Sequence, residues 1–143
     1  MTKYLTYLIG LLYVFNTACS QSNLHNDQTK VSSPNNQDTL PYDKSKVSAE
    51  TELANEFIGE KGIETKSGTI YYIEKDKQTI TAYENGKIKW QSNIIEECGV
   101  PPVGPAAIRF IRLYQDKLQV TFGKHSFATI NIKDGETTYL GAD

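Results

Sequence analysis

The chain has 143 residues and a formal net charge of −2, with 22% charged and 38% hydrophobic residues. This length leaves room for one modest globular domain. The slightly acidic balance offers no basic surface of the kind that binds nucleic acid, so we expect no nucleic-acid partner.

The N-terminus has the pattern of a secretory signal. Lys3 supplies a short positive region, and the stretch Tyr4 to Phe15 is an uncharged, mostly apolar run of about 12 residues. Because a membrane-spanning helix needs roughly 20 apolar residues, this run is too short for a stable span. Two small residues, Thr17 and Ala18, then lead to Cys19.

The segment that ends at Cys19 resembles the lipobox of bacterial lipoproteins, with Asn16 in place of the usual aliphatic residue. The resemblance implies cleavage after Ala18 and a diacylglyceryl group on the Cys19 thiol, with fatty acyl chains such as palmitate holding the protein to a lipid bilayer. Ser20, rather than Asp, follows the cysteine. By analogy with proteobacterial sorting, this implies the outer membrane. The alternative is ordinary secretion with cleavage after Ser20, which gives a soluble periplasmic protein.

Three parts follow from this interpretation: a signal peptide over 1–18, a lipidated, disordered tether over 19–47 and a β-rich globular domain over 48–143. The tether is rich in Ser, Asn, Gln, Asp and Lys, so it buries too little apolar surface to offset its ordering entropy. About 28 flexible residues span roughly 30 Å. The sequence leaves open whether Leu40, Pro41 and Tyr42 dock on the domain, contact a partner or belong to a plain linker.

The stretch from Ser48 to Gly59 predicts a short amphipathic helix. Ser48 is a candidate N-cap, the apolar residues between Leu53 and Ile58 share one face, and Gly59 can end a helix in the left-handed conformation. We expect this helix to cover one face or an open end of a sheet.

From Thr69 onward, apolar and polar residues alternate in the manner of β-strands. Short polar turns separate seven predicted strands: 69–74, 78–84, 87–92, 107–114, 117–122, 126–132 and 136–140. Asn85-Gly86 predicts a two-residue hairpin turn with positive φ at both positions, and Asp134-Gly135 is its counterpart. The short connections favour an antiparallel arrangement.

The two turns belong to two similar units. Ile80–Trp90 aligns without a gap with Thr129–Tyr139, 49 residues later. A repeat of this length is typical of propeller blades. The first unit resembles the blade of quinoprotein-type β-propellers, in which a Gly turn precedes a strand ending in Trp, here Gly86 and Trp90. Two units cannot close a propeller ring. We therefore predict a mainly β fold with two units of three to four antiparallel strands, packed as a small sandwich or open barrel.

Inward-facing positions follow from the alternation. We expect the core to contain Ile70, Tyr72, Ile80, Ala82, Ile88, Trp90, Ile108, Phe110, Leu118, Val120, Phe122, Ile130 and Ile132. Both Tyr71 and Tyr72 are compatible with the core, because both phases of that strand are apolar. Whether the units form one sheet or two is left open.

The candidate binding loop lies between the two units. Three prolines and two glycines within Ile94–Pro105 preset the backbone, and rigid loops on a sheet scaffold often carry binding sites. The candidate binding residues are Cys98, Val100, Pro101, Pro102, Val103 and Pro105. A simple crossover between sheets is the alternative. If Cys19 is acylated, Cys98 has no partner within the chain, so we expect its thiol to be buried or to pair between chains.

No arrangement in the sequence predicts catalysis, a metal or a cofactor. Glu96 and Glu97 are adjacent, so their side chains diverge on a strand or a helix. His125 and Ser126 are adjacent too, whereas a catalytic triad needs residues that converge in space with an orienting carboxylate. Cys98 and His125 lack neighbours at the spacing of zinc ligands.

The sequence thus predicts a lipid-anchored cell-envelope protein with a non-catalytic β-rich binding domain. We expect its partner to be another envelope protein, by analogy with small periplasmic inhibitors and immunity proteins. The alternatives are a scaffold lipoprotein of an envelope assembly complex and a small envelope hydrolase. The sequence does not indicate an oligomeric state.

Overall fold

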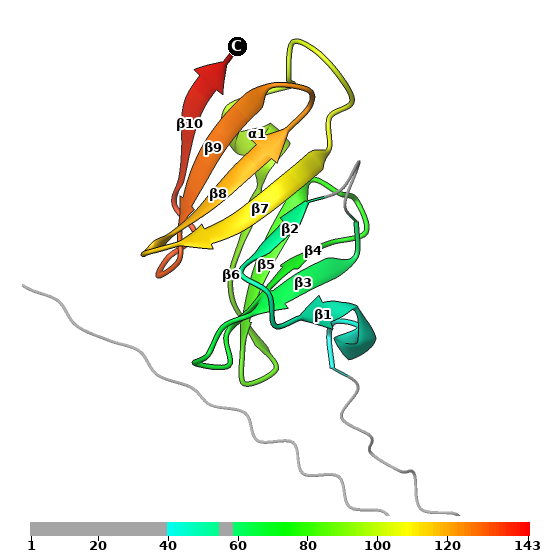
Figure 1. Cartoon of the computed structure of the whole chain (residues 1–143), viewed down its shortest axis with the longest axis vertical. Helices are drawn as coiled ribbons and strands as arrows, with labels where there is room; N and C mark the ends of the chain where they lie inside the picture. The colour runs from blue at the N-terminus through cyan, green and yellow to red at the C-terminus, as the bar shows by residue number, and fades with distance from the viewer. Residues whose placement is uncertain (1–39, 55–58) are drawn as a thin grey trace, which may run out of the picture. The chain divides into compact units, whose positions relative to one another are not determined.

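The computed structural model describes residues 40–54 and 59–143, which belong to one compact unit, Asn36–Asp143 (Figure 1). The expected signal peptide, Cys19 and the tether up to residue 39 lie outside the described residues. The elements are a 3-10 turn η1 (Lys44–Lys46), β1 (Val47–Ser48), β2 (Glu52–Ala54), β3 (Lys61–Glu64), β4 (Ile70–Ile73), β5 (Thr79–Glu84), β6 (Lys87–Asn93), α1 (Ile94–Cys98), β7 (Ile108–Tyr114), β8 (Lys117–Phe122), β9 (Ser126–Asn131) and β10 (Thr137–Ala142). Within those residues, no helix has the length and apolar character needed to cross a bilayer.

The ten strands form two five-stranded sheets. Sheet A has the order β1-β3-β4-β5-β6 and sheet B the order β10-β9-β8-β7-β2. All neighbouring pairs are antiparallel except β1 and β3, which are parallel. In Figure 1, the chain passes from β6 of sheet A through α1 and a loop into β7 of sheet B. The fold is therefore mainly β, and the described strands form no closed barrel.

All seven predicted strands are present, as β4 to β10. The first repeat unit forms β4, β5 and β6 of sheet A, and the second forms β8, β9 and β10 of sheet B, so each unit builds its own sheet. Asn85 and Gly86 both have positive φ, 53° and 73°, as the predicted hairpin turn requires. The second turn is longer, because Asn131 N–H donates to Glu136 O and Gly135 N–H donates to Asn131 O, both at 2.9 Å.

The helix predicted over Ser48–Gly59 is wrong for residues 48–54. Ser48 ends β1, and β2 pairs antiparallel with β7, aligning Leu53 with Ile111. Leu53 packs against the core from this edge position. The exposed edges of β3 and β7 offer backbone hydrogen bonds that outweigh a weak local helix preference. Residues 55–58 lie outside the described residues.

Residues 40–47, expected in the tether, include a segment that packs on sheet A. The ring centroid of Tyr42 lies 4.9 Å from that of Tyr83 and 6.0 Å from that of Tyr72. Together with Val47 and Ile70, these rings form an apolar cluster apart from the main core. The folded unit therefore begins ahead of the boundary expected at residue 48, because Tyr42 buries an aromatic ring on the sheet.

The main core draws on both sheets and on Ile94 of α1. Its buried residues are Ile63, Tyr71, Ile73, Ile80, Ala82, Trp90, Ile94, Ile108, Ile111, Leu118, Val120, Phe122, Ala128 and Ile130. Eight of the expected inward residues lie in this set, and Ile132 packs against it. Of the two tyrosines left open, Tyr71 faces the main core, whereas Tyr72 joins Ile70 in the cluster with Tyr42.

Two expected core residues are misplaced, each by a β-bulge. Ala82 pairs with Trp90 and Tyr83 with Ile88, so the bulge leaves the intervening residue unpaired and turns Ile88 outward, where it is 60% exposed. A second bulge at the start of β7 turns Phe110 away from the core and places Ile111 inside it. The alternation in these strands is interrupted, so a strict period of two fails there.

Trp90 joins sheet A to the β9–β10 turn of sheet B. Its indole Nε1–H donates to Ile132 O at 3.0 Å, and its ring stacks on Tyr71 with centroids 5.7 Å apart. The turn lies close against the indole ring, because a Cβ on Gly135 would lie 2.9 Å from Trp90 Cδ2. Nearby, the hydroxyls of Ser92 and Thr137 are 2.7 Å apart.

Candidate functional site

The predicted binding loop follows α1 and runs to β7. Asn93 caps α1, because its Oδ1 accepts the backbone N–H of Ile95 at 2.9 Å and that of Glu96 at 3.2 Å. Gly99 ends the helix with a φ of 85°, and its N–H donates to Ile95 O at 2.9 Å. The short helix thus sets the direction in which the loop leaves the core.

Backbone contacts hold the loop against the turn between β8 and β9. Lys124 N–H donates to Val103 O at 2.7 Å, and Arg109 Nη1 donates to Lys124 O at 3.0 Å. Pro101 is buried against Gly123, where an added Cβ would lie 2.4 Å from Pro101 Cβ. The loop is therefore a braced part of the fold.

The side chains of this loop divide into supporting and exposed groups. Pro101 supports, whereas Pro102 and Pro105 are exposed. Val100 is 75% exposed and Val103 is 52% exposed. The structure therefore exposes two aliphatic side chains and two proline rings to solvent, on a backbone that is held by the β8–β9 turn.

Cys98 lies at the base of the loop rather than on its outer surface. It is a free, partly buried thiol that packs against the main core. Burial, and to a lesser extent the charge of Glu97, raises the pKa of this thiol. A raised pKa lowers the thiolate fraction at neutral pH.

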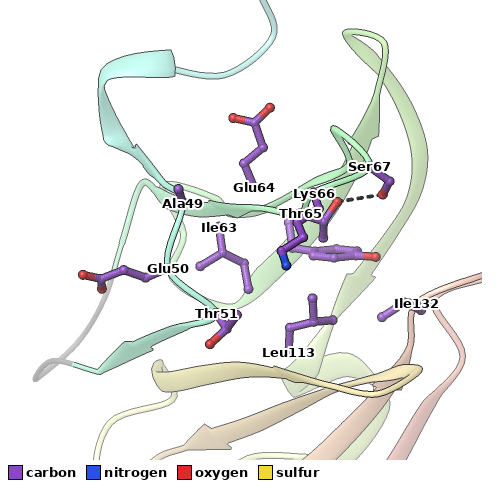
Figure 2. Close-up of a pocket in the computed structure, with 11 residues that line it drawn as sticks. Ala49, Glu50, Thr51, Ile63, Glu64, Thr65, Lys66, Ser67, Leu113 and Ile132 are labelled. Atoms are coloured by element: carbon purple, nitrogen blue, oxygen red, sulfur yellow. Dashed lines mark hydrogen bonds between the residues drawn. The ribbon is translucent and has the colours of Figure 1, made fainter.

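Sequence reasoning missed a groove at the seam between the sheets, shown in Figure 2. It has a volume of about 460 Å³. Its larger apolar lining residues are Ile63, Tyr71, Leu113 and Ile132, and Ala49 adds a small one. Its polar and charged lining residues are Glu50, Thr51, Glu64, Thr65, Lys66 and Ser67. A local sequence pattern could not indicate the groove, because its lining residues come from five separate stretches of the chain.

One wall of the groove is the segment 49–51, which passes from sheet A to sheet B. Just before it, Ser48 pairs with Ile63 of β3, and at its last residue Thr51 O accepts the N–H of Leu113 at 2.8 Å. Both ends of this wall are therefore attached to a sheet. The sequence did not indicate this wall, because it predicted a helix over the same residues.

The opposite wall is the turn between β3 and β4. The Thr65 hydroxyl lies 2.9 Å from the Ser67 hydroxyl and accepts the Thr69 N–H at 3.0 Å. Thr65 N–H donates to Thr69 O, and Gly68 N–H donates to Thr65 O, each at 2.9 Å. Internal hydrogen bonds thus hold this wall in shape. The signal for this turn was Lys66-Ser67-Gly68, a cluster of turn-forming residues.

The residues weighed for catalysis lie apart from the groove. His125 is the last residue of the β8–β9 turn, and Ser126 is the first residue of β9. The Ser126 side chain is buried, and its hydroxyl has no hydrogen-bond partner within the described part of the chain. Glu96 and Glu97 are exposed on α1. Across residues 40–54 and 59–143, no group of three or more His, Cys, Asp or Glu is placed to hold a metal ion.

Comparisons of the chain with protein-family models, with curated proteins and with solved structures returned no match.

Proposed function

We propose that this protein is a lipid-anchored lipoprotein of the bacterial envelope whose β-rich domain binds another envelope protein without catalysis. The contact surface is the loop after α1, with Val100 and Val103 as its apolar anchors. The observation that supports this role is the combination of a braced backbone with exposed apolar side chains.

Such a loop suits protein binding for an energetic reason. A flexible loop loses conformational entropy when a partner orders it, whereas a loop already held by hydrogen bonds loses little. Here Val103 O and Lys124 N–H are 2.7 Å apart, and Pro101 is wedged against Gly123. Burying aliphatic side chains such as Val100 then contributes roughly 25 cal/mol per Å² of apolar surface removed from water.

Photocrosslinking tests this surface directly. A photoreactive amino acid is placed at Val100, at Val103 or, as a matched control, at Ile88, which is 60% exposed on a strand of sheet A. The full-length lipoprotein is expressed in its own cell envelope. We expect the two loop positions to yield the same discrete protein adduct and the Ile88 position to yield none. An identical adduct from Ile88, or no adduct from the loop, refutes the proposal.

The anchor is proposed on the residues around Cys19. Two or more acyl chains hold a protein stably on a bilayer, whereas one chain holds it only marginally. We expect Cys19→Ala to move the protein from the membrane fraction to the soluble fraction after cell fractionation. Cys98→Ala is the matched control and leaves the protein in the membrane fraction. Unchanged membrane association of the Cys19→Ala variant contradicts lipidation at this cysteine.

A further inference from the structure

We propose that the groove between the sheets binds a small amphiphilic carboxylate, with its apolar part on the floor and its carboxylate at Lys66. This site is distinct from the loop with Val100 and Val103, so the two proposals stand or fall separately. The ligand class is a compound with one carboxylate on an apolar body.

Size and lining favour a small molecule. Pockets for small ligands have volumes of about 300–1,000 Å³ and a mainly apolar lining with a few polar groups. The groove has about 460 Å³, with Ile63 and Tyr71 from sheet A and Leu113 from sheet B on its floor. An apolar chain lying here loses contact with water on the sides that face both sheets.

The groove is formed before any ligand arrives. The segment 49–51 is attached at both ends, and the hydroxyls of Thr65 and Ser67 hold the opposite turn. Ligand binding therefore requires no ordering of these two segments, which removes one of the main costs of binding. Trp90 adds support from beneath, because its ring stacks on Tyr71.

The orientation of the three charged lining residues favours an anion over a cation at the apolar floor. Figure 2 shows the Lys66 side chain directed toward the apolar floor, while the carboxylates of Glu50 and Glu64 point away from it. None of these three side chains forms an ion pair among the residues that the structure describes. A carboxylate in the groove is thus attracted by the Lys66 ammonium group, whereas a ligand ammonium ion in the same place is repelled by it.

The test uses the chain from residue 19 onward with Cys19→Ser, which retains the whole compact unit Asn36–Asp143 and carries no lipid. Decanoate, decanol and decylammonium are titrated separately below their aggregation limits, with backbone amide signals recorded by NMR. We expect decanoate to bind most tightly and to shift the amide signals of residues 49–51 and 63–67. Equal binding of decanol or decylammonium overturns the proposal, as does decanoate binding that shifts signals elsewhere.

A pair of lysine variants isolates the charge. Lys66→Gln should weaken decanoate binding roughly three- to fivefold, the upper part of the range for an exposed ion pair, and leave decanol binding unchanged. Lys75→Gln is the control, because Lys75 is also exposed and lies beyond the far end of β4. An equal effect of both variants, or no effect of either, overturns the role of Lys66. Val100→Ser with Val103→Ser leaves decanoate binding intact, which separates this site from the protein-binding loop.

Discussion

Replacing Gly135 by Ala tests whether the β9–β10 turn is packed against Trp90. The Gly135 φ is 81°, and the added Cβ would lie 2.9 Å from Trp90 Cδ2 and 3.0 Å from Cε3. The indole ring has little freedom to move aside, because its Nε1–H donates to Ile132 O and its ring stacks on Tyr71. The substitution therefore combines backbone strain with overpacking.

The two contributions can be separated by a matched glycine. Gly68 has a φ of 83°, and a Cβ there would meet nothing within 4 Å. Gly68→Ala should thus lower the free energy of unfolding only by the strain of an alanine at positive φ, roughly 1–2 kcal/mol. Gly135→Ala adds about 1–3 kcal/mol for overpacking. That difference lowers the melting temperature by a further 4–8 °C per kcal/mol, approximately, in a domain of this size.

Urea denaturation followed by far-UV circular dichroism measures both variants against the parent chain. Trp90 is the only tryptophan, so its fluorescence reports separately on the packing of the turn. We expect a larger loss of stability for Gly135→Ala than for Gly68→Ala, with a change in the emission of folded Trp90 only in Gly135→Ala. Equal losses in the two variants would refute the proposed contact.

Burial of Tyr83, and then the hydrogen bond from its hydroxyl to Glu74, raise the Tyr83 pKa to about 12. Between about pH 10 and about 12 the folded chain keeps this proton, whereas the unfolded chain releases it. The free energy of unfolding should therefore fall with rising pH across that window, and it should fall less steeply in Tyr83→Phe. Equal slopes of the two chains in urea titrations would contradict this. Ile80→Val should lower the free energy of unfolding in urea by about 0.5–1.5 kcal/mol, because Ile80 is buried, whereas Ile88→Val should leave it almost unchanged, because Ile88 is exposed. Similar losses in the two variants would contradict the β6 bulge. The raised pKa of Cys98 should make its reaction with a thiol reagent at pH 7 faster after unfolding, and an unchanged rate would argue against its burial.

Strand positions from residue 69 onward were predictable because their signals are local. Alternation and turn chemistry act over a few residues, and Asn85-Gly86 specifies its hairpin through the positive φ of both residues. Hence the predicted strand over 117–122 coincides with β8. The repeat of 49 residues also indicated two similar units, each of which forms its own sheet.

The direction of individual side chains was less predictable, because bulges depend on pairing. Ile88 and Phe110 both fit the apolar phase of their strands, yet each lies beyond a bulge that reverses the phase. The bulge is defined by which residue of the neighbouring strand pairs with which, a relation that neither strand contains alone. Local sequence therefore identified the strands but misplaced these two residues.

The candidate loop and the groove differ most in how far the sequence could predict them. The sequence by itself identified the rigid character of the loop around Pro101, because proline and glycine restrict the backbone locally. Only the tertiary structure placed the segment 49–51 across both sheets and brought Ile63 and Leu113 to one floor. The physical reason is that free strand edges drew the N-terminal segment into β1 and β2, and such edges exist only once β3 and β7 have formed.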